Sequence, residues 1–288
     1  MLKILITFFI ISFFSACSFA ETTPFIMGYD QIMPASFFGL NENQKIGHLF
    51  QNPALIAPIK SQQIKFNTSP SYYGYNFLSF GYIFSYTNFV IGLGYQSLSA
   101  NDIKYTTQIG TARPSILEYS THENSIIKLA AAYPILVNTY LGASLNNFSQ
   151  KIVSATYQAL YGDIGIYYNY ENFIYLGCYS MYYFNLPSSF HTDTELNLEK
   201  TICFEGYLKE KGFHLGYQFN NEHKLFAAAD LTSAFNISMQ GLFTDKIKLK
   251  SFTIGTAISL DKITFEYLLT QYYVESELTH LLGLKYNF

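Results

Sequence analysis

Residues 78–86 read LSFGYIFSY, and this stretch decides the class of fold. Large apolar or aromatic side chains occupy every second position from Leu78 to Tyr86, and Ser79, Gly81 and Ser85 stand between them. Successive side chains of a β-strand point to opposite faces, so this alternation predicts a strand with one apolar face. Further segments with the same alternation begin at residues 89, 127, 160, 213, 263 and 282. We therefore predict an all-β protein.

Charged residues of the predicted strands fall on the face that carries the small residues. A lysine that faces lipid at the middle of a bilayer costs about 2–4 kcal/mol, whereas one that faces a barrel lumen can be hydrated. The pattern thus fits a membrane barrel in which these charges line the lumen: Lys128, Asp163, Glu205, His214, Asp230, Glu266 and Lys285. Both signs of charge occur, so two roles stay open. The charges could line a polar channel or hold the plug, or they could pair with one another and only fill the interior.

The composition agrees with a surface that contacts lipid. Of 288 residues, 13% are charged and 18% are aromatic, with 27 Phe, 26 Tyr and no Trp. Apolar surfaces with rings at the interfaces are typical of membrane barrels. The net charge of -3 gives no electrostatic reason to expect a nucleic-acid partner.

The first 20 residues resemble an export signal. Lys3 provides the positive charge, residues 4–14 form an apolar stretch too short to span a bilayer as a helix, and residues 18–20 place small side chains at a cleavage site. We predict cleavage near Ala20. A lipoprotein signal processed at Cys17 is the alternative.

Beyond residue 20 no run of 18 or more apolar residues occurs, which argues against a helical membrane protein. A chain that enters a membrane with strands must form a closed barrel, because only closure leaves no unpaired sheet edge in lipid. A secreted β-sandwich would show the same alternation with its apolar face turned inward. The export signal and the many Phe and Tyr residues favour the barrel.

Three regions follow from this pattern: a signal peptide over 1–20, a plug-like segment over 21–60 that holds half of the eight prolines, and an outer-membrane β-barrel over 61–288. We predict a transmembrane antiparallel up-and-down barrel of about 14 strands. The strands begin near residues 61, 75, 88, 122, 138, 157, 172, 198, 211, 223, 235, 246, 262 and 278. Short turns are expected near 86–88, 134–138, 168–172, 208–212, 231–235 and 260–262, with long connections over 97–121 and 183–197.

The sequence provides no catalytic constellation. It has no G-x-S-x-G, no H-E-x-x-H and no phosphate-binding glycine loop, so we predict no enzyme, no cofactor and no metal. After signal cleavage Cys178 and Cys203 are the only cysteines. The strand pattern points them to different faces of neighbouring strands, which predicts two free thiols.

Two places resemble a known family. Asn52-Pro53-Ala54 stands just before the first predicted strand, and the chain ends in a strand that contains Thr279-His280 and finishes at Phe288. Together they resemble the FadL-like superfamily of outer-membrane proteins, including its PorV/PorQ-like branch. The family fold is a 14-stranded barrel with an N-terminal plug. The residues themselves suggest that this turn stabilises a sharp reversal into the barrel wall, because Pro53 restrains Asn52, whose side chain can hydrogen-bond nearby backbone. An ordinary surface turn is the alternative.

The resemblance implies two functions. The first is passage of small hydrophobic compounds across the bacterial outer membrane, past the plug. The second is a non-enzymatic PorV/PorQ-like barrel that binds or anchors secreted proteins at the cell surface. It also implies that Tyr286 and Phe288 belong to a terminal signal read by the barrel-assembly machinery, and that outer-membrane lipid surrounds the wall.

Overall fold

The structure of the protein is a computed structural model. It describes residues 45–50, 52–72, 75–107, 115–152, 155–170, 174–184, 202–210, 212–220, 222–243, 248–273 and 278–288. The predicted signal peptide over 1–20 and the first part of the plug-like segment lie outside these residues. In the part that is described, no helix is long and apolar enough to cross a membrane.

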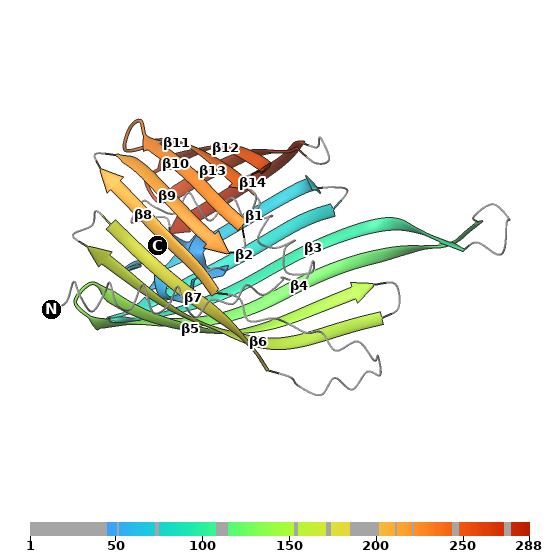
Figure 1. Ribbon diagram of the computed structural model, residues 1–288, viewed down its shortest axis with the longest axis horizontal. Helices are drawn as coiled ribbons and strands as arrows, with labels where there is room; N and C mark the ends of the chain where they lie inside the picture. Colours follow the sequence, from blue (N-terminus) through green and yellow to red (C-terminus); the bar gives the residue numbers. More distant parts are fainter. Residues whose placement is uncertain are drawn as a thin grey trace.

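Among the described residues, fourteen antiparallel strands follow one another around a closed barrel, and β1 pairs with β14 to complete it (Figure 1). The predicted fold is confirmed. The strands are β1 (Gln63–Tyr72), β2 (Tyr75–Tyr86), β3 (Phe89–Thr107), β4 (Ser115–Leu136), β5 (Thr139–Ile152), β6 (Ala155–Tyr170), β7 (Ile174–Phe184), β8 (Ile202–Glu210), β9 (Phe213–Asn220), β10 (Glu222–Asp230), β11 (Phe235–Phe243), β12 (Leu249–Leu260), β13 (Ile263–Tyr272) and β14 (Leu278–Asn287).

The wall has an apolar outer face and a mostly polar inner face. In β14 the exposed residues alternate strictly with the buried residues Leu281, Gly283 and Lys285. A closed barrel turns the exposed positions to its surroundings and the buried ones to its lumen. The outward face includes exposed Leu93, Leu129, Ile164, Ile254 and Leu282. The alternation that predicted the fold therefore has the orientation that a lipid-facing wall requires.

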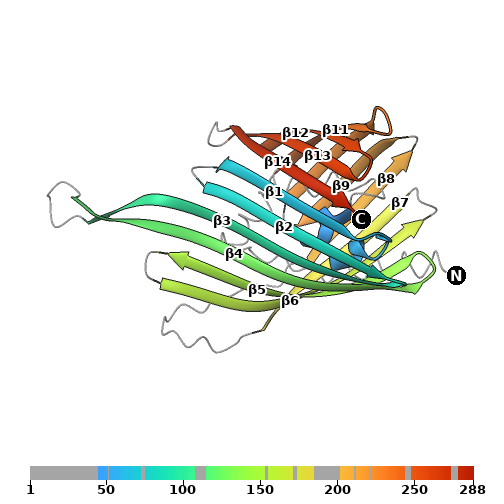
Figure 2. The same cartoon turned by 180° about the vertical axis from the view of Figure 1, so that it is seen from behind.

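Tight turns join the strands at the barrel end that contains the C-terminus (Figure 2). Thr87, Asn138 and Asp261 have φ of 51, 62 and 52°, and Gly212 has φ of 80°. Two-residue hairpins that match strand twist require positive φ, which explains these values. The short turns predicted near 86–88, 134–138, 208–212, 231–235 and 260–262 are confirmed, and the turn near 168–172 lies partly outside the described residues.

The long connection predicted over 97–121 is wrong. β3 continues to Thr107 and β4 begins at Ser115, with two register shifts between them. β2 stops pairing with β3 at Ser99, so the extension is a two-stranded ribbon that projects beyond the neighbouring strands (Figure 1). A ribbon outside the barrel has no lumen face and no lipid face, so its sequence shows no strong alternation. The connection predicted over 183–197 lies mostly outside the described residues.

Two short 3-10 helices precede the barrel wall, η2 (Lys45–Phe50) and η3 (Pro53–Ile56). Both lie inside the ring of strands in either view (Figures 1 and 2). We call residues 45–60 the inner segment. The two cysteines lie in β7 and β8, where Cys178 is opposite Phe204 and Cys203 is opposite Tyr179. They therefore occupy consecutive positions of that ladder and so belong to opposite faces of the sheet, as predicted.

Candidate functional site in the barrel interior

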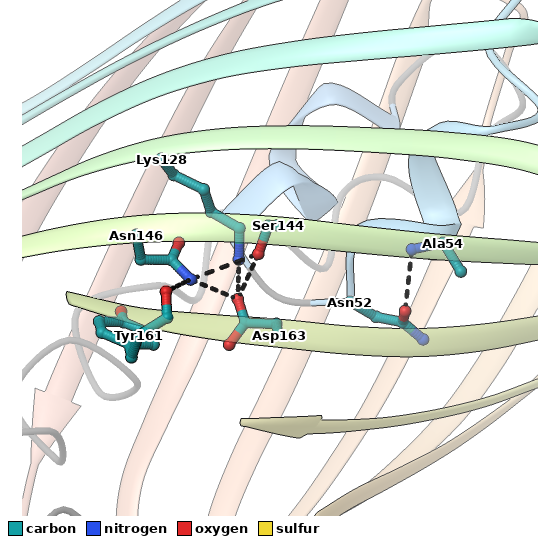
Figure 3. A network of polar contacts seen from close by, with 7 residues as sticks. All are labelled: Asn52, Ala54, Lys128, Ser144, Asn146, Tyr161 and Asp163. Carbon is teal, nitrogen blue, oxygen red and sulfur yellow. Dashed lines mark hydrogen bonds and ion pairs between the residues drawn. The ribbon is translucent and has the colours of Figure 1, made fainter. Parts of the chain in front are cut away.

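The Asn52-Pro53-Ala54 turn connects the inner segment to the wall. Asn52 has an extended backbone, and its Oδ1 accepts a hydrogen bond of 3.0 Å from the N–H of Ala54 (Figure 3). Its Nδ2 donates to the carbonyl of Ile166 in β6 at 3.2 Å. Pro53 occupies the first turn of η3, where a missing N–H costs nothing. One fully buried amide thus caps the helix and bonds the wall.

Inward glycines of β3 and β5 provide the space that the inner segment occupies. A Cβ atom added at Gly142 would collide with the backbone of Pro53 and Ala54. A Cβ at Gly92 would collide with the side chain of Leu49. We call Gly92, Gly94 and Gly142 the glycine seat, with Gly94 lying under the ring of Phe50. Any larger residue at Gly142 requires the backbone of η3 to move.

Two apolar clusters surround the segment. The first joins Ile46, Leu49, Ile56 and Ile59 to residues of β2, β3 and β4 that include Val90. The second contains Ala54 and Leu55 together with Tyr167 of β6, Phe226 of β10 and, at its edge, Tyr140 of β5. Since β6 and β10 are separated by three strands in the barrel order, the inner segment has apolar contacts across the lumen and not with one wall alone.

A buried ion pair between β4 and β6 lies beside the Asn52-Pro53-Ala54 turn (Figure 3). Lys128 Nζ is 2.6 Å from Asp163 Oδ2. The same oxygen accepts hydrogen bonds from Ser144 Oγ at 2.7 Å and from Asn146 Nδ2 at 3.0 Å. Both charged side chains are 3% exposed. Two further donors on one carboxylate oxygen stabilise the ionised pair in a place where water is largely excluded.

A second group of charged residues lies on β1, β13 and β14, where the barrel closes. Lys65 of β1 lies 2.5 Å from Glu266 of β13, and Lys285 of β14 is opposite Lys65 in the register. All three residues are buried. The sequence prediction included Glu266 and Lys285 but missed Lys65. The alternation of Gln63, Lys65 and Asn67 with Ile64 and Phe66 was the signal that could have found it.

A third polar group lies near the turn end of β9 and β10. His214 Nε2 is 3.0 Å from Asp230 Oδ2, and Asn236 donates to Asp230 Oδ1 at 2.7 Å. His214 is buried and Asp230 is partly exposed. Glu205 lies in β8, and its side chain is outside the described set. Six of the seven residues predicted to line the lumen therefore occupy three local polar groups, and each group contains an acidic residue together with a lysine or a histidine.

One part of the lumen is apolar. Six buried residues from five strands form a cluster, which we call the apolar lumen face: Phe77, Leu98, Ala257, Leu268, Tyr272 and Leu281. Phe50 of the inner segment packs against it and also against the first cluster of the segment. In β13 and β14, Leu268 and Leu281 are opposite each other and follow the pair Glu266 and Gly283. The apolar lumen face therefore adjoins the charged group on β1, β13 and β14.

The chain terminus completes the wall. β14 ends at Asn287, one residue before the predicted end, and the N–H of Phe288 donates to the carbonyl of Gln62 at 3.0 Å. The rings of Tyr286 and Phe288 meet edge to face with centroids 4.9 Å apart, on the exposed side of the strand. Recognition of these residues by an assembly machinery stays a prediction.

These features define a class: a closed membrane-type β-barrel with an apolar outer band and an inner segment in its lumen. No group of His, Cys, Asp or Glu suited to a metal occurs among the residues that the structure describes. No family model matches the chain, and no curated protein matches it.

Solved structures define the fold further. The toluene transporter TodX of Pseudomonas putida superposes with a TM-score of 0.63 at 8% identity, covering 85% of this chain and 94% of that one. The monoaromatic hydrocarbon channel CymD gives 0.61 at 9% identity, covering 84% and 93%. A FadL homologue of Pseudomonas aeruginosa gives 0.57 at 8% identity, covering 87% and 95%. The chain thus has the fold of FadL-like channels, as the resemblance implied.

Proposed function

We propose that the protein is a non-enzymatic outer-membrane channel that admits small hydrophobic compounds. The observation that carries the proposal is the apolar lumen face with Phe50 packed against it. The other two apolar clusters of the interior enclose residues of η2 and η3, so this face is where an apolar molecule gains most from leaving water. Solved channels of the same fold are named for toluene and monoaromatic hydrocarbons, which supports a ligand of similar chemistry.

In this proposal residues 21–60 act as a plug, and the described part of it lies in the lumen against the wall. The contacts of Asn52, the glycine seat and the two apolar clusters support a fixed plug over a loose one. The charged residues then stabilise the wall and the plug by mutual pairing, since Lys128, Lys65 and His214 each have an acidic partner. Short turns at the end with the C-terminus support placing that end in the periplasm.

The function can be tested with two adjacent leucines. Leu268 is buried in the apolar lumen face, whereas Leu269 lies on the other face of β13. The purified barrel is titrated with toluene, and thermal unfolding is followed. A ligand present at 100 times its Kd raises the free energy of unfolding by about 2.7 kcal/mol. We expect Leu268→Ala to weaken this stabilisation by toluene and Leu269→Ala to leave it unchanged.

Uptake in cells provides the second measurement. A strain without the protein should take up labelled toluene more slowly, and the wild-type chain should restore the rate. Absence of both a toluene-dependent stabilisation and an uptake defect would rule out the channel function for this ligand class. The anchoring alternative predicts instead that a secreted protein co-purifies with the barrel, and no feature of the described residues favours it.

A further inference from the structure

Two tyrosine–histidine pairs lie on the outer wall. Tyr267 Oη of β13 is 2.7 Å from His280 Nδ1 of β14. Tyr217 Oη of β9 is 2.7 Å from His223 Nδ1 of β10. The ring centroids are 6.0 Å apart in both pairs. Neither pair belongs to the interior site.

The two pairs repeat one arrangement on different strands. His280 is opposite Leu269, two residues beyond Tyr267. His223 is opposite Phe219, two residues beyond Tyr217. In each case the histidine reaches diagonally across the ladder to a tyrosine on its own face. The flanking sequences differ, so the recurrence is a property of position on the wall and not of a repeated motif.

Their position is the edge of the apolar band. Tyr217 and Tyr267 are about two-fifths exposed, and Leu225 and Leu282 beside them are half exposed. His223 is the second residue of β10 and His280 the third of β14, both at the strand end remote from Phe288. An outward apolar band about 25 Å tall covers roughly the length of such strands, so their ends lie at headgroup level. The tyrosine rings then lie in the outer part of the acyl layer.

The chemistry of the pair suits this boundary. A phenol in lipid requires a hydrogen-bond partner, and Nδ1 supplies one. When the phenol donates to Nδ1, the imidazole proton is on Nε2, so the ring presents an N–H donor at its other edge. Phosphate oxygens are the strongest acceptors at headgroup level. Hydrogen bonding to the tyrosine fixes the ring that would make this contact.

We propose that the Tyr267–His280 pair is a site for the phosphate group of a lipid in the leaflet next to the strand ends. The inference rests on the membrane location in the proposed function. The imidazole of His280 donates to a phosphate oxygen, and the phenol of Tyr267 holds the imidazole in place. The occupant is a membrane lipid and not free phosphate, because its acyl chains lie along the apolar band beside the pair.

The test uses the full chain reconstituted in phosphatidylcholine vesicles, with insertion checked by the faster migration of the unboiled protein on a denaturing gel. Spin-labelled phosphatidic acid and spin-labelled diacylglycerol, which lacks the phosphate group, are compared by their association with the barrel. We expect the wild type to prefer phosphatidic acid by about fivefold at this site, the factor of one net hydrogen bond. The variant H280F removes the imidazole donor and should lose the preference.

Two controls sharpen the result. Y267F should reduce the preference, because the imidazole of His280 loses the bond that orients it, whereas Y86F at an exposed tyrosine of the turn end should not change it. Inorganic phosphate at millimolar concentration should not compete. An inserted wild-type barrel with equal association of both lipids would overturn this inference alone, and competition by inorganic phosphate would overturn the lipid assignment. A chain that does not insert would overturn the proposed function as well.

Discussion

The two sides of the barrel differ in how they are built. β3, β4, β5 and β6 have 19, 22, 14 and 16 residues, whereas β8, β9, β10 and β11 have 9, 8, 9 and 9. The long side contains the glycine seat, the Asn52 contact with β6 and the Lys128–Asp163 pair. The short side is about as long as a bilayer requires and, among the described contacts, meets the inner segment through Phe226.

This difference indicates that one side holds the inner segment and the other completes the membrane wall. The extra residues of the long strands do not form the glycine seat, because Gly92 and Gly142 lie near the turn end of their strands. The extra residues of β3 and β4 form the ribbon that projects at the opposite end. If this division is right, changes on the long side should loosen the inner segment, and changes to the ribbon should not.

The largest effect is expected from breaking the buried ion pair of the long side. Lys128→Met leaves the carboxyl group of Asp163 buried without its cationic partner, which should lower the free energy of unfolding by about 3–5 kcal/mol. Guanidinium unfolding of the barrel in detergent measures it. The double variant K128M/D163L removes both charges and should recover most of the loss. A double variant as unstable as the single one would show that the pair is not the source of the stability.

A smaller effect is expected at the glycine seat. Gly142→Ala places a carbon against the backbone of η3 and should cost about 1–3 kcal/mol, with the inner segment becoming sensitive to trypsin. Gly81→Ala is the matched control, since a Cβ there lies 3.4 Å from Ile46, an ordinary contact. Equal protease sensitivity of the two variants would contradict a seat specific to Gly142.

The Asn52 contacts should matter less. Asn52→Ala removes two hydrogen bonds and should cost about 1–2 kcal/mol. Asn52→Asp keeps the acceptor for the Ala54 N–H but loses the donor to β6, so it separates the cap from the wall contact. We expect N52D to resemble N52A in the exposure of the inner segment to trypsin. If N52D instead behaves as the wild type, the bond to Ile166 does not hold the segment.

The smallest effect is expected from shortening the ribbon. Residues 101–121 are replaced by a two-residue turn that joins Ala100 to His122, which are opposite each other in the register. The ribbon contributes nothing to the described lumen contacts, so the free energy of unfolding should change by less than about 0.5 kcal/mol. The gel migration of the unboiled protein and guanidinium unfolding check this together.

The sequence predicted the wall far better than the interior. Every predicted strand start lies within four residues of the observed one except that of β4, predicted near 122 and observed at 115. The two-residue period records which face meets lipid, and this constraint acts on each strand separately. The ribbon escapes the rule because it lies outside the barrel.

The interior was predicted only in part because it depends on partners far apart in the chain. Alternation placed Gly92 and Gly94 on the inner face, but it could not show that Gly142 meets Pro53 and Ala54 across nearly 90 residues. The ion pair between Lys128 and Asp163 also could not be predicted from the alternation. Lys128 and Asp163 were each predicted to face the lumen, whereas their contact follows from the combined register of β4, β5 and β6.

The ladder between β1 and β14 has a consequence for how the chain folds. It joins Gln63 to Asn287, so closing it fixes a loop of almost the whole barrel, and the entropy of that step exceeds that of any hairpin in the wall. Neighbouring hairpins should therefore form first and this seam last. The inner segment enters directly into β1 at the seam. We expect it to lie within the curved sheet before the seam closes, because afterwards it could enter the ring only through an open end.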